Sequence, residues 1–126
     1  TQYHFQVARE VIAAGVHALI EKPLCSTSAE GRSLVSDLPE GLVVGVGHIE
    51  RFNPVVKEIR KIIRKPLYVE MKRHNPASTR VKGTSVVDDL MIHDIDIALH
   101  AFFRSRPTSL VSAGSDDVAS VLLRWG

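Results

Sequence analysis

The sequence predicts a mixed α/β fold, in which a parallel α/β part is followed by an α+β part with an open, mainly antiparallel sheet. Residues 17–20 and 42–47 are short apolar runs, and each follows a stretch with helical spacing after a short loop. Strands that are apolar without interruption are typical of a parallel sheet covered on both faces. From about His48 onward, alternating patterns and polar turns replace these runs, which indicates a sheet with one covered face.

The first part opens with a helix over residues 2–14, where apolar residues recur at helical spacing. We expect Thr1 to cap this helix and Gly15 to end it. The strand at residues 17–20 follows directly, and Pro23 ends it because proline lacks the backbone N–H that a strand ladder uses.

A second helix is predicted from a cap at Ser26 and Thr27 to about Ser36. Glu30 lies near its start, where the positive end of the helix dipole favours a carboxylate. The next strand, at residues 42–47, is rich in β-branched side chains. Because a helix joins the two strands, we expect them to run parallel.

The α+β part begins with a helix from Pro54 to about Arg64, which Pro66 closes. Residues 67–74 alternate between apolar and polar side chains and therefore predict a strand with one covered face. The remaining expectations are a polar loop at 75–85, a helix at 86–103, strands at 109–113 and 118–124, and a turn at 114–117.

The helix at residues 86–103 carries the most informative side chains. At about 100° per residue, Asp89, His93, Asp96 and His100 fall within about 60° of one another, with apolar residues in nearly every other direction. A helix that is apolar almost all round is buried, and buried polar groups need partners or chemistry. A carboxylate one turn before a histidine orients the imidazole and raises its basicity, which is the arrangement of a general base.

Other interpretations of these polar residues stay open. They could form a buried network that only stabilises the fold, or a metal site, since Asp89 and His93 have the i, i+4 spacing of metal ligands. No H-E-x-x-H pattern supports a metal. His100 is expected to be a satisfied core histidine. His4 and His17 are expected to be structural, although His4 lies near a strand end and remains a candidate for a ligand contact.

Polar residues follow both predicted parallel strands, at the edge where such sheets bind ligands. Lys22, between Glu21 and Pro23, would point its ammonium group into a ligand crevice. Alternatively, Glu21 and Lys22 are only surface-loop residues. After the second strand, Gly45 and Gly47 permit a close backbone approach.

Arg51 and Asn53 lie in the segment that follows the second strand. Arg51 could clamp a phosphate or carboxylate with two parallel hydrogen bonds. Alternatively, Asn53 only caps the following helix while Arg51 pairs with a surface acid. Both interpretations stay open from the local pattern alone.

Composition excludes several kinds of partner. The 126 residues amount to one domain or parts of two. The formal net charge is only +2, and no block of Lys and Arg with aromatic residues between them occurs. Both observations argue against a nucleic-acid partner. No run approaches the roughly 18 apolar residues of a membrane span, so no membrane partner is expected. The single cysteine, Cys25, excludes an internal disulfide, is expected to be a small core residue, and favours the cytoplasm.

Three motifs in this order resemble the glucose–fructose oxidoreductase and inositol dehydrogenase family, Gfo/Idh/MocA. Thr1-x-x-His4 followed by Glu21-Lys22-Pro23 resembles the family's start and signature, and residues 47–54 (GHIERFNP) are similar to the segment that joins its two domains. Residues 89–96 resemble the motif D-x-G-x-H-x-x-D, with Met91 in place of the glycine. The last two motifs are most similar to members that oxidise nucleotide-linked amino sugars.

The resemblance implies hydride transfer between a sugar hydroxyl carbon and the nicotinamide of NAD or NADP. Lys22 would stabilise the developing alkoxide, His93 would take the hydroxyl proton as general base, and Asp89 would fix the histidine tautomer. It also implies a cis bond between Lys22 and Pro23. The implied cofactor contacts are Glu21, Lys22, Pro23, His4 and Arg51, the implied substrate contacts are Lys22, Arg51, Asn53, His74, Asp89 and His93, and no metal is implied.

The resemblance also divides the chain. Residues 1–47 would be the remainder of a dinucleotide-binding Rossmann domain, and residues 48–126 a truncated α+β domain for substrate binding and oligomerisation. The family's G-x-G-x-x-G turn is absent from the sequence. We therefore expect a fragment of a longer protein that, alone, binds dinucleotide weakly and does not turn over.

Two other functions compete with this one. The first is a non-catalytic protein of the same fold that binds or senses a sugar nucleotide, although a pure binder needs no proton acceptor beside a lysine. The second is a metal-dependent sugar hydrolase or isomerase that uses the His/Asp helix. The expected ligand is a small sugar or nucleotide sugar. An open sheet is expected to pack against another subunit, which predicts a homodimer or homotetramer.

Overall fold

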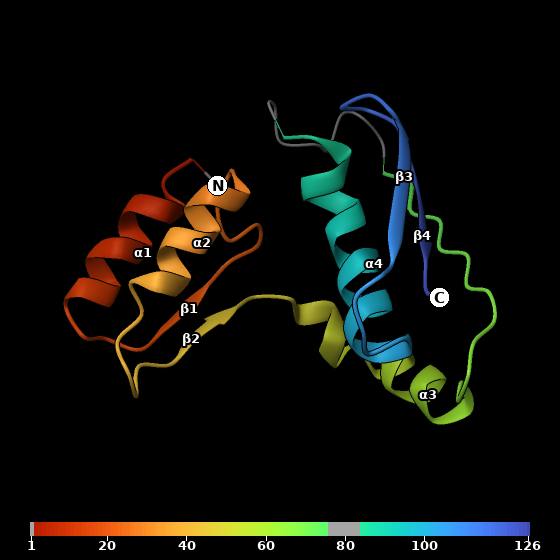
Figure 1. Cartoon of the computed structure of the whole chain (residues 1–126), viewed down its shortest axis with the longest axis horizontal. Coiled ribbons are helices and arrows are strands. Elements are labelled where there is room, and N and C mark those ends of the chain that lie inside the picture. Colours follow the sequence, from red (N-terminus) through yellow and green to blue (C-terminus); the bar gives the residue numbers. More distant parts are fainter. Residues whose placement is uncertain (1, 76–83) are drawn as a thin grey trace. The chain divides into compact units, whose positions relative to one another are not determined.

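The computed structural model describes residues 2–75 and 84–126, and their contacts divide the chain into two compact units (Figure 1). Unit 1 is Thr1–His48 and unit 2 is Ile49–Gly126. The expected helix cap Thr1 and residues 76–83 of the expected polar loop lie outside the described residues. That unit 1 is part of a dinucleotide-binding domain and unit 2 a substrate domain stays a prediction.

Unit 1 contains two helix–strand pairs in the predicted order. They are α1 (His4–Ala13), β1 (Ala18–Ile20), α2 (Ser28–Ser36) and β2 (Val44–Val46). The strands pair in parallel, with Ala18 opposite Val44 and Ile20 opposite Val46. The predicted parallel α/β arrangement is therefore confirmed. The first helix begins two residues later than expected, and Tyr3, the residue before it, makes no side-chain cap hydrogen bond.

The core of unit 1 lies where α1 and α2 pack on each other and on the sheet (Figure 1). Ala8, Ile12 and Leu34 are buried there. The partly buried side chains packed against them are Phe5, Ile20, Leu24, Leu42 and Val44. Two helices and a short parallel sheet thus share one apolar cluster, as the helical spacing of residues 2–14 predicts.

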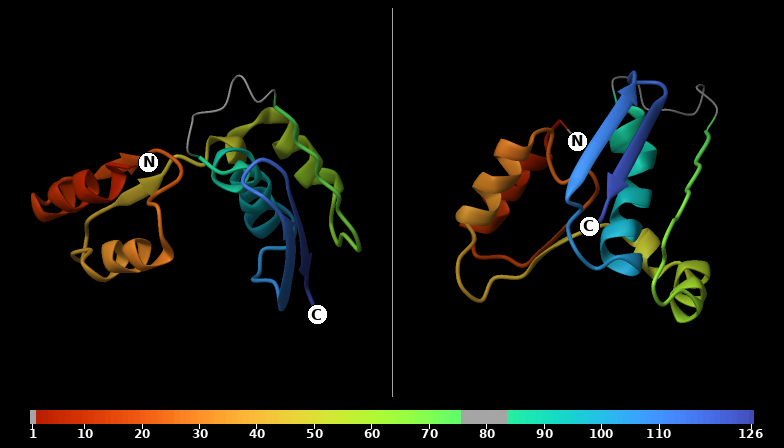
Figure 2. Two further views of the ribbon diagram at one scale, coloured as in Figure 1. Left: turned by 90° about the horizontal axis from the view of Figure 1, so that it is seen from above. Right: turned by 45° about the vertical axis from the view of Figure 1, so that its right-hand side comes forward.

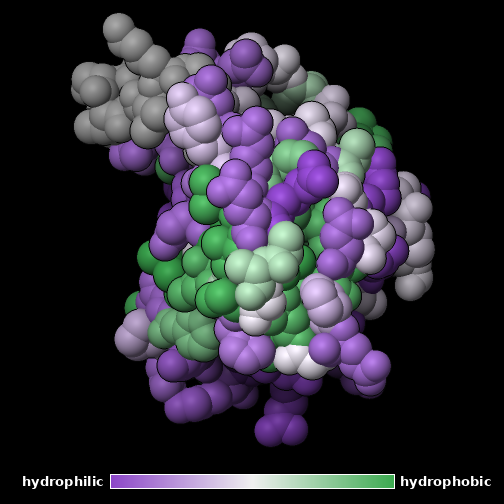
Figure 3. Space-filling view, turned by 90° about the vertical axis from the view of Figure 1, so that its left-hand side faces the viewer, coloured by the Kyte–Doolittle hydropathy of each residue, from purple (hydrophilic) through white to green (hydrophobic). Residues whose placement is uncertain are grey.

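The expectation that both strands are covered on both faces is wrong for the described residues. Leu19 is 78% exposed, because alternate strand residues point to opposite faces and only one face carries the core cluster. Its Cδ1 atom lies over Gly45, 3.3 Å from where a Cβ there would stand. Figure 3, which views the left-hand side of Figure 1, shows apolar side chains gathered between hydrophilic ones.

The predicted cap at Thr27 is confirmed, and the structure extends it to a complete capping box with Glu30. The Thr27 Oγ1 accepts a hydrogen bond from the Glu30 backbone N–H at 3.2 Å, and Glu30 Oε2 accepts from the Thr27 N–H at 3.0 Å. The same carboxylate oxygen accepts from the Ser26 N–H at 2.9 Å. Three backbone donors that the helix itself leaves without a partner are satisfied in this way.

Cys25 is half-buried just before this capping box, and its thiol donates to the Thr27 carbonyl at 3.2 Å. Burial raises the pKa of Cys25 above its ordinary value, and the nearby Glu30 carboxylate raises it further. A thiol with a raised pKa is largely protonated at neutral pH and is a poor nucleophile. Cys25 is therefore a partly buried, weakly nucleophilic thiol, and it is not among the residues of the core cluster.

Unit 2 combines helices with an antiparallel hairpin (Figures 1 and 2). A 3-10 turn, η1 (Ile49–Phe52), leads into α3 (Pro54–Ile62). A long helix follows, with a central α-helical stretch between two π-helical turns. These segments are η3 (Val87–Met91), α4 (Ile92–Ile97) and η4 (Ala98–Phe102). The hairpin of β3 (Ser109–Gly114) and β4 (Ala119–Arg124) completes the unit.

The hairpin turn needs glycine at position 114. Gly114 has a φ of +138°, and a Cβ there would lie 2.1 Å from the Val118 carbonyl oxygen. Antiparallel pairing runs from Ser109 opposite Arg124 to Gly114 opposite Ala119. The predicted strands and the turn between them are confirmed.

Two expectations for unit 2 are wrong. No strand forms within residues 67–74, where Leu67 is fully exposed. An alternating pattern gives a strand only where a neighbour offers a hydrogen-bonding ladder, and a groove of about 530 Å³ lies between this segment, the long helix and β4. The long helix is also not buried all round. Among its described residues only Asp96, Ile97 and Ala98 are buried, near where η1 and α3 pack.

Thr27→Ala tests the capping box. We expect the free energy of unfolding to fall by about 1 kcal/mol, because the Glu30 N–H loses its acceptor. Urea unfolding followed by circular dichroism measures this change. Ser26→Ala is the matched control, since it keeps the backbone N–H that Glu30 accepts from. Equal stability of the two variants would contradict the capping role.

The pH dependence of Cys25 alkylation tests the raised pKa. The midpoint of the iodoacetamide rate against pH is expected to lie above that of a small free thiol. Glu30→Gln removes a negative charge, keeps an acceptor for the cap and should move the midpoint down. A midpoint below that of the free thiol would show that the surroundings favour the thiolate instead.

Candidate functional site

Unit 1 brings the ends of β1 and β2 to one edge of its sheet. The Gly47 N–H donates to the Ile20 carbonyl at 2.7 Å, so the chain segments after both strands start side by side. A Cβ at Gly47 would stand 3.1 Å from the Glu21 carboxylate. Glycine therefore allows the close backbone approach that the sequence predicts, and the neighbour is Glu21 of the same unit.

Lys22 follows at this edge, and its peptide bond to Pro23 is cis, as expected. Pro23 is buried, and its carbonyl accepts a hydrogen bond from His4 Nδ1 at 2.7 Å. Because a carbonyl only accepts, the proton of a neutral His4 ring is on Nδ1, and its Nε2 is left as an acceptor. The first residue of α1 thus holds the turn that carries Lys22.

His17 has the structural role that the sequence predicts. Its Nδ1 accepts a hydrogen bond from the Val43 N–H at 2.9 Å, and the Val43 carbonyl accepts from the Ala18 N–H at 3.0 Å. The imidazole therefore extends the parallel ladder by one bond at the start of both strands.

Asp89 and His93 lie on the long helix of unit 2, and both are half-buried. Asp89 belongs to the π-helical turn η3 and His93 to α4. In an α-helix, residues four positions apart are rotated by slightly more than one full turn. A π-helical turn holds more residues, so the rotation between Asp89 and His93 is smaller than in a regular α-helix. The Nδ1 atom of His93 is buried.

Asp96, on the same helix, is a buried charged residue that Arg51 neutralises. Arg51 Nε lies 2.6 Å from one Asp96 oxygen and Nη2 lies 2.5 Å from the other, in the planar fork geometry of a strong ion pair. Asp96 is 6% exposed and Arg51 is 41% exposed. The hydrogen bonds to Asp96 raise the pKa of Arg51 above its already high ordinary value.

Local hydrogen bonds also occupy Asn53. Its Oδ1 accepts from the Val55 N–H at 3.0 Å and caps α3, and its Nδ2 donates to Glu50 Oε2 at 3.0 Å. The cap and the pairing of Arg51 match the second of the two interpretations above, except that the acid, Asp96, is buried. Arg51 and Asn53 as ligand contacts stay predictions.

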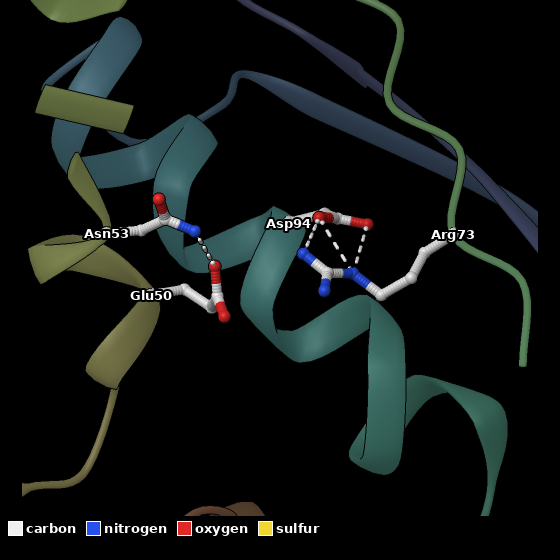
Figure 4. A network of polar contacts seen from close by, with 4 residues as sticks. All are labelled: Glu50, Asn53, Arg73 and Asp94. Carbon is white, nitrogen blue, oxygen red and sulfur yellow. Dashed lines mark hydrogen bonds and ion pairs between the residues drawn. The ribbon is translucent and has the colours of Figure 1, made fainter. Parts of the chain in front are cut away.

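Figure 4 shows polar contacts near this segment that the sequence interpretation missed. Arg73 donates to both oxygens of Asp94, with the shortest distance 2.9 Å from Nη2 to Oδ1. These bonds raise the pKa of Arg73, and the Glu50 carboxylate adds to the shift. A signal was present: Arg73 falls on the apolar side of the alternating pattern at 67–74, where a charge needs a counter-charge.

The other two candidate histidines of unit 2 are exposed. His74 lies in the wall of the groove described above, beside Arg73. His100 is 55% exposed, with Nε2 3.7 Å from an Asp96 oxygen, so its assignment as a core histidine is wrong. It lies in the π-helical turn η4.

The candidate residues therefore form two groups. Lys22, His4 and Glu21 belong to unit 1, and Asp89 and His93 belong to unit 2. Across residues 2–75 and 84–126, no three His, Cys, Asp or Glu side chains gather as metal ligands would. Over the same residues, no helix has the length and apolar character to span a bilayer.

Comparison with known proteins adds a family. Residues 1–48 match the model of an oxidoreductase family with an NAD-binding Rossmann fold. A UDP-N-acetylglucosamine 3-dehydrogenase of Acidithiobacillus ferrooxidans is 40% identical over 101 residues, which cover 79% of this chain and 32% of that protein. A scyllo-inositol 2-dehydrogenase (NADP(+)) of Bacillus subtilis is 31% identical over 113 residues, with the same coverage, 79% and 32%. The chain thus spans about a third of the length of these curated relatives.

Solved structures agree with this assignment. The UDP-N-acetylglucosamine 3-dehydrogenase of Acidithiobacillus ferrooxidans matches with a TM-score of 0.80 and 33% identity, over 98% of this chain and 43% of that one. A dehydrogenase of Clostridium difficile matches with a TM-score of 0.73 and 29% identity, over 90% of this chain and 37% of that one. These similarities confirm the resemblance that the motifs indicate. Residues 1–48 match the Gfo/Idh/MocA family of oxidoreductases with an NAD-binding Rossmann fold, and the longer matches above show that the rest of the chain is similar to dehydrogenases too.

Proposed function

We propose that the protein carrying this chain is an NAD(P)-dependent dehydrogenase that transfers a hydride between a sugar hydroxyl carbon and the nicotinamide ring. Two features observed together carry the proposal. Residues 1–48 match an NAD-binding family, and Asp89 and His93 place a carboxylate and an imidazole on one helix of unit 2. Relatives named as sugar and inositol dehydrogenases support the substrate class. The 40% identity to a UDP-N-acetylglucosamine 3-dehydrogenase favours a nucleotide sugar.

Lys22 is proposed to stabilise the alkoxide that develops when the hydroxyl group loses its proton. An ammonium group beside that oxygen lowers the energy of the developing negative charge and holds the reacting carbon in line. The buried Pro23 and its hydrogen bond from His4 support the turn from which Lys22 extends. This fixed turn is what an electrostatic role requires, because a preorganised charge needs no rearrangement during the reaction.

His93 is proposed to take the hydroxyl proton at Nε2. Its Nδ1 is buried, which makes Nε2 the candidate nitrogen for the substrate. Asp89, one turn earlier on the helix, would orient the ring and stabilise the imidazolium that forms. A general base in position contributes about 10²- to 10⁴-fold to such a rate.

The dinucleotide is proposed to lie at the edge of the unit 1 sheet. The residues there fit its nicotinamide end, since a lysine and a buried proline follow a parallel strand where such sheets bind ligands. NAD or NADP would supply the hydride acceptor. Glu21, Lys22, Pro23 and His4 are the candidate contacts of unit 1. Arg51, Asn53 and His74 are the further candidates of unit 2, with Arg51 and Asn53 already engaged by neighbours.

A homo-oligomer in the cytoplasm completes the proposal. All six residues of β3 are exposed, and Leu110, Val111 and Leu122 are apolar side chains at the surface of the hairpin. An open sheet with such side chains is a natural place for a second subunit. The lone, partly buried Cys25 suits a reducing compartment.

Lys22→Ala and His93→Ala test the proposed roles in the full-length protein, assayed with NAD, NADP and a panel of UDP-sugars. Each variant is expected to lower kcat by about 10²-fold or more, with dinucleotide binding retained. Added imidazole should restore part of the rate of His93→Ala only. Lys61→Ala is the control, because Lys61 is exposed and bonds to Glu58 on α3. Wild-type rates in both variants would refute the roles, and sugar-nucleotide binding without turnover in the wild type would favour a binding protein.

A further inference from the structure

We propose that Arg51 and Asp96 act together as a positioning pair that holds the helix of His93 in its working place. The inference rests on the proposed dehydrogenase function, because it gives these two residues a role in the same reaction. Neither residue is assigned to the proton transfer itself. The pair acts through the helix that both Asp96 and His93 share.

The burial of Asp96 makes its ion pair with Arg51 a constraint on the helix. Asp96 is the buried charged side chain of the described residues, and it lies three positions after His93 within the α-helical stretch α4. A carboxylate taken out of water costs free energy unless a cation and hydrogen bonds compensate it. Any movement of α4 that separates Asp96 from Arg51 therefore carries a penalty, and His93 moves with the same rigid helical turn.

Arg51 reaches Asp96 from a segment whose neighbouring residues are fixed by hydrogen bonds. It lies on η1, the turn that leads into α3, and the next residues are fixed by the Asn53 cap and the Asn53–Glu50 hydrogen bond. Two donors of its guanidinium reach the two oxygens of Asp96 in one plane. Such a fork fixes orientation as well as distance, which a lysine at the same place cannot do. The ion pair thus joins α4 to the start of α3 with a defined geometry.

The Arg73–Asp94 pair provides a matched comparison on the same helix. It joins the same residue types, and Asp94 lies one position after His93. Its carboxylate is 15% exposed against 6% for Asp96, and Arg73 comes from the segment 67–74, which forms no helix or strand. Holding α4 to an irregular segment restricts it less than holding it to a capped helix. Arg73 and Asp94 should therefore matter little for positioning.

The experiment compares Arg51→Lys, Asp96→Asn and their double variant with Arg73→Lys and Asp94→Asn in the full-length protein. Each of the first two is expected to lower kcat by about 10- to 100-fold, since a misplacement of about 1 Å can cost that much, with KM for both substrates nearly unchanged. The double variant should be no slower than the slower single variant, because the two residues act as a unit. The comparison pair should stay within about threefold of wild type.

A second measurement keeps the test independent of turnover. Hydrogen exchange of the α4 amides is expected to speed up in Arg51→Lys and Asp96→Asn but not in the comparison variants. Fluorescence of Trp125, which stacks on Phe103 with ring centroids 3.9 Å apart, shows whether unit 2 keeps its fold. A protein without turnover but with this exchange pattern would defeat the proposed function and leave the positioning role standing.

Three results would overturn the inference. The first is unchanged exchange in both variants. The second is a rise of KM alone in Arg51→Lys together with a silent Asp96→Asn, which is the result for an arginine that clamps a ligand anion. The third is a double variant whose loss of kcat equals the two single losses combined, because independent effects would show that Arg51 and Asp96 do not act as one pair.

Discussion

The buried carboxylate of Asp96 is the constraint on which the arrangement of unit 2 depends. A helix whose faces are mostly apolar can bury an aspartate only where a counter-charge meets it. Arg51 supplies that charge from the turn before α3, and the contact thereby fixes which face of the long helix turns toward η1. Because Arg51 is 41% exposed, its own desolvation is modest, and the pair avoids much of the cost that a fully buried ion pair carries.

A different constraint organises unit 1. Parallel pairing of β1 and β2 requires their carboxyl ends to share one edge, so Lys22 and Gly47 follow from the same end of the sheet. The buried Pro23 and the hydrogen bond from His4 then tie the Lys22 turn to α1. In this way α1 supports Lys22, whose proposed role depends on a fixed position of its ammonium group.

Local signals in the sequence predicted the elements whose cause is local. The Thr27 cap of α2, the Asn53–Pro54 helix start and the glycine turn of the hairpin need only neighbouring residues, and all three form. Features that depend on distant partners were harder to predict. Residues 67–74 have a strand pattern but no ladder, and Leu19 has a core pattern but no cover on its face.

The candidate site divides in the same way. Lys22, Asp89 and His93 could be named as candidates because they stand in recognisable motifs, and their roles stay predictions. The partners of Arg51 and Arg73 were missed because each lies more than twenty residues away in sequence. The π turns also escaped prediction, since a hydrophobic pattern over residues 86–103 does not separate a π turn from an α turn.

We propose that the Lys22 ammonium group and the His93 imidazole act on one hydroxyl group of the substrate. A crystal structure of the full-length protein with NAD(P) and a bound sugar substrate measures this directly. The account predicts Lys22 Nζ and His93 Nε2 both within about 2.6–3.2 Å of the same substrate oxygen, or one bridging water away. A complex with the nicotinamide and sugar in place, and either atom out of reach of that oxygen, would contradict it.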